Sequence, residues 1–225
     1  EFAKSKMVDV IVLDHHQSES KLPNAYSIVN PNRFDDKSKL NYLCAAGVSF
    51  MFLIAINKLL RERLWFKENN TEEPNLINFL DLVSLGTVCD VVPLIGINRA
   101  IVKQGLKILK KNNNIGLKIL IDLCKIENKI TPYHLGYLIG PRINAGGRVG
   151  KCSHGANLLL NNNAKESFQI AIELDNYNKE RKILESDLLN KILNTNYNNS
   201  TDPVLILSGE NWHEGVIGII ASRIK

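Results

Sequence analysis

A carboxylate and two imidazoles stand next to one another near the start of the chain, as Asp14, His15 and His16. Carboxylate oxygens and imidazole nitrogens are ligands that proteins use for Mn²⁺, Zn²⁺ and Fe²⁺. The three residues directly follow the short apolar run at 8–13, so a tight turn there can direct one histidine at a metal ion and the next at a substrate. Taken alone, the tripeptide is more typical of a polar turn without a function.

A further acidic residue, Asp90, stands within an otherwise apolar stretch at 86–94, which is predicted to form a turn. Its neighbours on both sides are valines and a cysteine, which predict that the carboxylate is partly buried. A buried carboxylate needs a cation or hydrogen-bond donors to offset its loss of water. The residue is therefore a candidate metal ligand, and the simpler alternative is an aspartate that caps a turn.

The segment 140–148 combines positive charge with small residues. Arg142, Asn144 and Arg148 are separated by an alanine and two glycines. Such a loop lets the backbone approach an anion closely while guanidinium groups hold it. We interpret the segment as a phosphate-binding loop, and the alternative is a flexible glycine hinge with solvated arginines.

A glycine-rich turn near the end of the sequence follows a predicted strand at 203–207 and leads into a helix predicted to begin near Gly215. Backbone N–H groups at the start of a helix can bind phosphate when glycines leave them accessible. His213 and Arg223 lie near enough in the sequence to contribute to such a site. The alternative is an ordinary strand-to-helix turn.

Alternating strands and helices must position the first of these residues. Apolar runs and helical spacing predict strands at 7–13 and 26–30, and helices at 45–60, 76–85 and 98–109. This order favours a parallel α/β sheet with right-handed crossovers. Polar residues just past the carboxyl end of a strand line the ligand crevice in such sheets, and Asp14 to His16 occupy that kind of position.

The second half of the chain has a helical pattern. Helices are predicted at 116–124 and 134–139, followed by one long helix at 164–192 with a polar break at 178–181. An asparagine-rich linker at 194–200 then precedes the last predicted strand.

Composition narrows the class of protein. The chain has 225 residues, 44% of them hydrophobic, which is enough for a folded core. Its four cysteines are widely separated, as expected for reduced thiols in a cytoplasmic protein. No apolar run approaches the roughly 20 residues of a membrane span, so no membrane partner is expected. The net charge of +5 permits a nucleic-acid partner without requiring one.

Four blocks, at 10–16, 86–94, 142–148 and 211–223, resemble in order the motifs of the DHH phosphoesterases and of their associated DHHA1 domain. With residues 174–181, they resemble the bacterial members that degrade single-stranded DNA from the 5′ end. The resemblance implies an α/β fold in three parts: a partial parallel-sheet DHH domain at 1–110, a helical region at 111–195 with the phosphate loop and the long connecting helix, and the start of an α/β DHHA1 domain at 196–225.

The resemblance also implies a chemistry, that of a phosphodiesterase with two Mn²⁺ or Mg²⁺ ions. It implies metal ligands at His15 and Asp90, catalytic residues at Asp14, His16, Arg142 and Asn144, and substrate-binding residues at Arg148, His213, Gly215 and Arg223. Asp14 would orient the site, His16 would face the scissile phosphate, and the arginines would hold substrate phosphates. The implied partners are single-stranded DNA and other proteins of DNA repair and recombination.

One departure from the family concerns the start of the chain. The family carries further metal-binding aspartates on strands that precede the DHH motif, whereas this sequence starts 13 residues before Asp14. We therefore expect the polypeptide as given to supply too few ligands to hold two metal ions, to be catalytically inactive on its own, and to expose a sheet edge.

Two other functions remain open on this sequence. The first is a relative that hydrolyses short oligonucleotides or cyclic dinucleotides. The second is a non-catalytic nucleic-acid-binding relative that has kept the fold. Substrate length separates the first alternative from the exonuclease, and binding without cleavage identifies the second.

Overall fold

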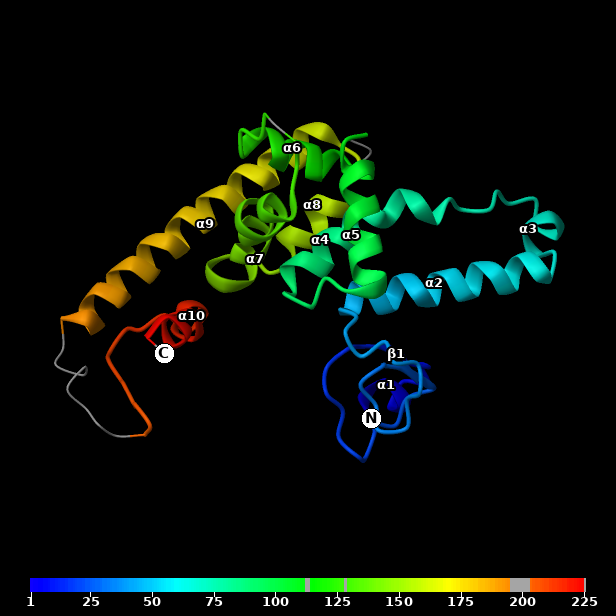
Figure 1. Ribbon diagram of the computed structural model, residues 1–225, viewed down its shortest axis with the longest axis horizontal. Helices are drawn as coiled ribbons and strands as arrows, with labels where there is room; N and C mark the ends of the chain where they lie inside the picture. Colours follow the sequence, from blue (N-terminus) through cyan, green and yellow to red (C-terminus); the bar gives the residue numbers. More distant parts are fainter. Residues whose placement is uncertain (112–113, 128, 195–202, 225) are drawn as a thin grey trace. The chain divides into compact units, whose positions relative to one another are not determined.

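The computed structural model describes residues 1–111, 114–127, 129–194 and 203–224 (Figure 1). It divides into two compact units, one of residues 1–113 with 128–136 and the other of residues 114–127 with 137–225. The predicted three-part division stays a prediction. Its boundary at 195/196 lies outside the described residues, as does most of the predicted linker at 194–200.

The first unit begins with a short helix and a small sheet. Helix α1 (Phe2–Ser5) precedes strands β1 (Ile11–Leu13) and β2 (Ser27–Val29), which pair in parallel with Leu13 opposite Val29. The predicted parallel strands are therefore confirmed, although both are shorter than expected. Strand β1 is only partly buried, since Ile11 is 52% exposed. The described part of this unit is otherwise helical.

Helix α2 (Ala45–Glu62) confirms the amphipathic helix expected after the sheet. Cys44 caps its first turn, since the Cys44 sulfur accepts a hydrogen bond from the backbone N–H of Gly47. Val48 and Phe50 lie on its buried face. A short helix, α3 (Trp65–Glu68), follows it.

A helical hairpin carries the second acidic residue. It consists of η1 (Leu76–Phe79), α4 (Leu80–Cys89) and α5 (Gly96–Leu109). The core of this region is built from apolar residues of α2, α4 and α5, namely Phe50, Leu80, Val83, Ile101 and Ile108. These residues hold α4 against α2 and α5. Asp90 is the capping residue at the C-terminal end of α4.

The turn predicted at 86–94 is wrong for its first four residues, which form the last turn of α4. Glycine and β-branched residues weaken an isolated helix, and here tertiary contacts override that preference. Gly86 allows a close approach to Ala46, because an added Cβ would lie 2.7 Å from the Ala46 Cβ. The Thr87 hydroxyl donates to the Val83 carbonyl at 2.7 Å and so has a partner within the helix.

The second unit consists of helices joined by loops in its described residues. Its elements are α6 (Ile115–Leu123), α7 (Gly140–Val149), α8 (His154–Leu160), α9 (Ala164–Leu193) and α10 (Glu214–Ile224), with η2 (His134–Ile139) leading into α7. Figure 1 shows α9 as one long uninterrupted ribbon, which confirms the long helix predicted at 164–192, and the polar stretch at 178–181 lies within it. The polar residues there are held within the helix, where the Arg181 guanidinium contacts Asn178 and Glu185.

Two further predictions fail in this unit. The predicted phosphate loop at 142–148 is helical and forms most of α7. Pro141 suits the first turn of a helix, and Gly146 permits close packing, since an added Cβ would lie 2.7 Å from the Lys151 carbonyl oxygen. The strand predicted at 203–207 is absent from the described residues, where this segment has no pairing partner and precedes α10.

The contact between α9 and α10 forms the second core, built from Leu188, Ile192, Val216 and Ile220. The parallel strand pair and the surrounding helices together agree with the predicted α/β class, with helices dominating. Within the described residues, no helix has both the length and the apolarity needed to cross a membrane.

We expect Gly105→Ala to destabilise the first unit. A Cβ at this position of α5 would lie 2.2 Å from the Leu80 carbonyl oxygen and 2.5 Å from the Ser84 Cβ, so the two helices would have to move apart. Such overpacking costs about 1–3 kcal/mol in unfolding free energy, measurable by urea denaturation. Gly147→Ala is the control, because an added Cβ meets nothing within 4 Å there. Equal effects of the two substitutions would contradict the close helix contact.

Candidate metal centre

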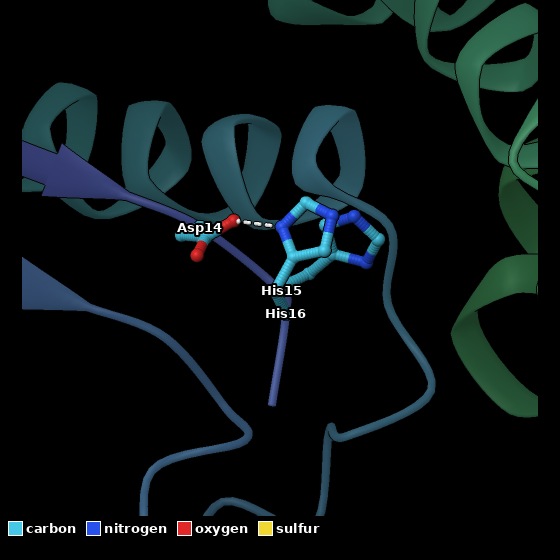
Figure 2. A group of neighbouring side chains, drawn as sticks. All are labelled: Asp14, His15 and His16. Carbon is cyan, nitrogen blue, oxygen red and sulfur yellow. Dashed lines mark hydrogen bonds and ion pairs between the residues drawn. The ribbon is translucent and has the colours of Figure 1, made fainter. Parts of the chain in front are cut away.

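The turn after β1 brings together side chains that can bind a metal ion. One ligand atom from each of Asp14, His15 and His16 lies within 4.8 Å of the others. Figure 2 shows the two imidazoles side by side, with His16 turned toward Asp14. The side chain of His16 is 78% exposed, whereas that of His15 is only 16% exposed. The turn therefore offers one sheltered and one accessible imidazole.

Asp14 and His16 form a direct pair. The His16 Nδ1 donates a hydrogen bond to the Asp14 Oδ1 at 2.7 Å. This bond holds the pKa of the Asp14 carboxyl below its ordinary value, against a smaller opposing effect of burial, and the backbone N–H groups of the two histidines lower it further. Asp14 is therefore ionised at neutral pH, as a metal ligand or an orienting carboxylate must be.

The structure places Asp90 beside this turn, although the two are far apart in the sequence. The His15 Nδ1 lies 3.4 Å from the Asp90 Oδ2. Two ligand atoms that each lie about 2.0–2.2 Å from one ion, at an angle between about 90° and 110°, are roughly 2.8–3.6 Å apart. The His15–Asp90 pair thus has the spacing of two ligands to a single ion. An imidazole with carboxylates suits Mn²⁺ well.

The backbone beside Asp90 is held in an unusual conformation. Val91 has a φ of 58°, which a β-branched residue rarely adopts. Asn98, which is fully buried, holds the segment that follows. Its amide donates to the carbonyl oxygens of Pro93, at 2.9 Å, and Tyr42, at 2.7 Å. The role of Asn98 was not predicted from the sequence, where the residue is recognisable only as an amide in the first turn of a helix that follows an apolar loop.

In the second unit, Arg142 is bound to the protein rather than to solvent. Its Nε donates to the Asp175 Oδ1 at 2.8 Å, and its Nη1 donates to the Leu138 carbonyl at 2.7 Å. Lys179 also pairs with Asp175, at 2.7 Å. Arg142 therefore anchors α7 to α9, and the neighbouring Asn144 is exposed on the same helix.

This ion pair should make stability depend on pH. Burial by itself would raise the pKa of Asp175, but the hydrogen bond from Lys179 and the charge and hydrogen bond of Arg142 outweigh it, so the net pKa is lowered. Because folding lowers this pKa, the ionised Asp175 carboxylate stabilises the folded protein at pH values above the ordinary pKa of 3.8. This stabilisation is lost as the pH falls through the folded-state pKa.

We therefore expect Asp175→Asn to lower the unfolding free energy by about 1–3 kcal/mol at pH 7, as for other charged hydrogen bonds. The difference from wild type should shrink as the pH falls below about 4, because the wild-type carboxyl then becomes protonated as well. Denaturation curves at pH 7, 4 and 3 measure this change in the difference. A loss that is equally large at every pH would contradict the electrostatic origin.

The remaining predicted DNA-binding residues meet where α7 contacts α10. The Arg148 Nη1 donates to the Gly215 carbonyl at 3.1 Å, and the His213 Nδ1 accepts from the Gly215 N–H at 3.0 Å. Gly215 is required by the close approach, because an added Cβ would lie 2.2 Å from the Arg148 carbonyl oxygen. Arg223 instead pairs with Glu185 of α9. Their role in DNA binding stays a prediction.

Comparison with known proteins gives matches over the whole chain. Residues 1–87 match the family model described as "DHH family, N-terminal domain". The chain is 39% identical over 232 residues to the single-stranded-DNA-specific exonuclease RecJ of Escherichia coli, covering 100% of this chain and 40% of that protein. RecJ of Thermus thermophilus is 36% identical over 221 residues, covering 96% of this chain and 30% of its own length.

Solved structures agree with these matches. An exonuclease RecJ bound to manganese superposes with a TM-score of 0.81 at 32% identity, covering 99% of this chain and 53% of that one. RecJ of Thermus thermophilus in complex with Mn²⁺ gives a TM-score of 0.78 at 35% identity, covering 98% of this chain and 31% of that one. The chain thus spans about 40% of the length of the curated relative from Escherichia coli.

Proposed function

We propose that this chain forms part of a metal-dependent exonuclease, because its residues 1–87 match the DHH family model and it is similar along its length to the RecJ exonucleases. The proposed reaction is hydrolysis of phosphodiester bonds in single-stranded DNA, beginning at the 5′ end and serving DNA repair and recombination. We also propose a cytoplasmic location with reduced thiols, in line with the four free cysteines.

The observation that carries this proposal is the approach of His15 to Asp90, at 3.4 Å between the Nδ1 and Oδ2 atoms. The two side chains come from separate elements, the turn after β1 and the end of α4, so local chain geometry alone does not explain their meeting. With the ionised Asp14 next to them, they supply the nitrogen and oxygen donors that Mn²⁺ accepts. We propose His15 and Asp90 as metal ligands.

The chemistry divides between the ions and the chain. His15 and Asp90 would hold a divalent ion, and bound divalent ions would supply a hydroxide at neutral pH and stabilise negative charge on the scissile phosphate. Asp14 orients the His16 ring through the bond to Nδ1, which leaves the exposed ring edge with Nε2 free to turn toward a substrate phosphate. His16 would then hold or transfer a proton at that nitrogen.

The second unit would bind the DNA strand. Asn144 and Arg148 are exposed on α7, and we propose that they contact substrate phosphates. Arg142 would reach a phosphate only by leaving Asp175, so we propose that it positions α7 instead. His213, Gly215 and Arg223 are proposed to extend this surface at the start and end of α10.

The test of this proposal uses the complete protein, meaning the polypeptide encoded by the whole reading frame that contains these residues. With Mn²⁺ present, it is given a long single strand, the same strand in a blunt duplex, and a dinucleotide. We expect the single strand to be degraded and the duplex to be spared.

The other outcomes identify the alternatives. Faster hydrolysis of the dinucleotide would contradict the exonuclease proposal and favour an oligonucleotide or cyclic-dinucleotide phosphodiesterase. Salt-sensitive binding of the single strand with no cleavage in any metal would instead favour a non-catalytic binding protein.

A further inference from the structure

The hydrogen-bond ladder between β1 and β2 stops just before the two histidines. The last paired residues are Leu13 and Val29, and the Asp14 N–H still donates to the Val29 carbonyl at 3.1 Å. Beyond that point, the carbonyl groups of His15 and His16 no longer face a neighbouring strand. A main-chain carbonyl next to a partly buried turn needs another donor.

Two asparagines that follow β2 provide these donors. The Asn30 Nδ2 donates to the His16 carbonyl at 2.9 Å. The Asn32 Nδ2 donates to the His15 carbonyl at 2.6 Å, and also to the Asn41 carbonyl at 3.2 Å. Each histidine is thus tied through its own backbone to one side-chain amide.

The two amides are themselves held in place. The Asn30 Oδ1 accepts from the Asn32 N–H at 2.8 Å, which closes a small turn across the intervening proline. Asn30 is buried, with 6% of its surface exposed, so it is fixed by its surroundings. An asparagine suits this position because its amide offers donors and an acceptor together, whereas an aspartate has no proton to donate once it is ionised.

We propose that Asn30 and Asn32 are positioning residues of the metal centre, which fix the direction of the two imidazoles by holding the backbone from which they project. This inference rests on the proposed function, in which His15 binds a metal ion and His16 faces the substrate. This role of Asn30 and Asn32 does not follow from the Asp14–His16 tripeptide or from Asp90. Partners behind metal ligands typically change metal affinity about 10- to 100-fold when they are removed.

The test measures Mn²⁺ binding by calorimetry for the complete protein and for Asn30→Ala and Asn32→Ala. We expect the Kd for Mn²⁺ to rise about 10- to 100-fold in both variants. We also expect nuclease kcat to fall at limiting Mn²⁺ and to recover at high Mn²⁺, with KM for single-stranded DNA unchanged. A merely structural role would not give recovery by excess metal. Asn41→Ala is the matched control, since Asn41 is exposed and contributes only its carbonyl.

Further variants keep the result decisive. Should an alanine variant unfold, Asn32→Asp keeps the size of the side chain while removing the donor, and it should still lose metal affinity. Unchanged Mn²⁺ affinity in folded Asn30 and Asn32 variants would overturn the inference, provided that His15→Ala and Asp90→Ala bind Mn²⁺ more weakly. If those two substitutions also leave the affinity unchanged, the proposed metal centre itself is wrong and the positioning role falls with it.

Discussion

Asp90→Ala should reduce hydrolysis of single-stranded DNA at least about 100-fold, because even partners behind a metal ligand cost up to that factor when they are lost. Removing the carboxylate takes away the group that lies 3.4 Å from the His15 Nδ1 and leaves one fewer donor for the ion. The Kd for Mn²⁺ should rise in parallel. Initial rates of nucleotide release across a Mn²⁺ titration measure both effects.

The control for this substitution is Asp9→Ala, which removes an exposed aspartate from the same unit. It should leave both the rate and the Mn²⁺ affinity as they are in wild type. If Asp90→Ala keeps wild-type activity with a wild-type metal requirement, Asp90 is not a metal ligand. The contact between His15 and Asp90 would then serve only to stabilise the fold.

Glu185→Ala is expected to cause the largest loss of stability, about 3–5 kcal/mol in unfolding free energy. Glu185 lies on α9 with 2% of its surface exposed and pairs with two arginines. The Arg181 Nη1 is 2.5 Å from the Glu185 Oε2, and Arg223 reaches the other carboxylate oxygen from α10. Without the carboxylate, the nearly buried guanidinium of Arg181 has no counter-charge, and that is the main cost.

Glu180→Ala provides the comparison, because Glu180 is an exposed glutamate on the same helix. Its effect should be small, as is usual for surface substitutions. Urea denaturation followed by circular dichroism gives both values. A loss for Glu185→Ala no larger than that for Glu180→Ala would show that the two ion pairs of Glu185 contribute nothing to stability.

The elements with strong local patterns could be predicted from the sequence. Apolar residues at helical spacing located α2, α5 and α9 to within a few residues, and a β-branched run located β1. The meeting of His15 with Asp90 could not be worked out in this way, because periodicity says nothing about which distant segments touch. It was expected only because the ordered motifs resembled those of a known family.

The glycine-rich segments misled the sequence analysis for a physical reason. Glycines in the segment 142–148 suggested a loop, yet Gly146 serves to let α7 pack closely in a helical conformation. Gly215 is likewise required by the close approach of the Arg148 backbone. Asn30 and Asn32 escaped notice because an asparagine next to a proline is also common in ordinary turns.

End-labelled strands test whether the complete protein degrades single-stranded DNA from the 5′ end in a metal-dependent reaction. The complete protein is incubated with Mn²⁺ and one oligonucleotide that carries its label at either the 5′ or the 3′ end. We expect early release of the 5′ label as a mononucleotide, gradual shortening of the 3′-labelled strand, and no reaction in EDTA. Early release of the 3′ label, internal cuts, or full activity in EDTA would rule out the proposed reaction.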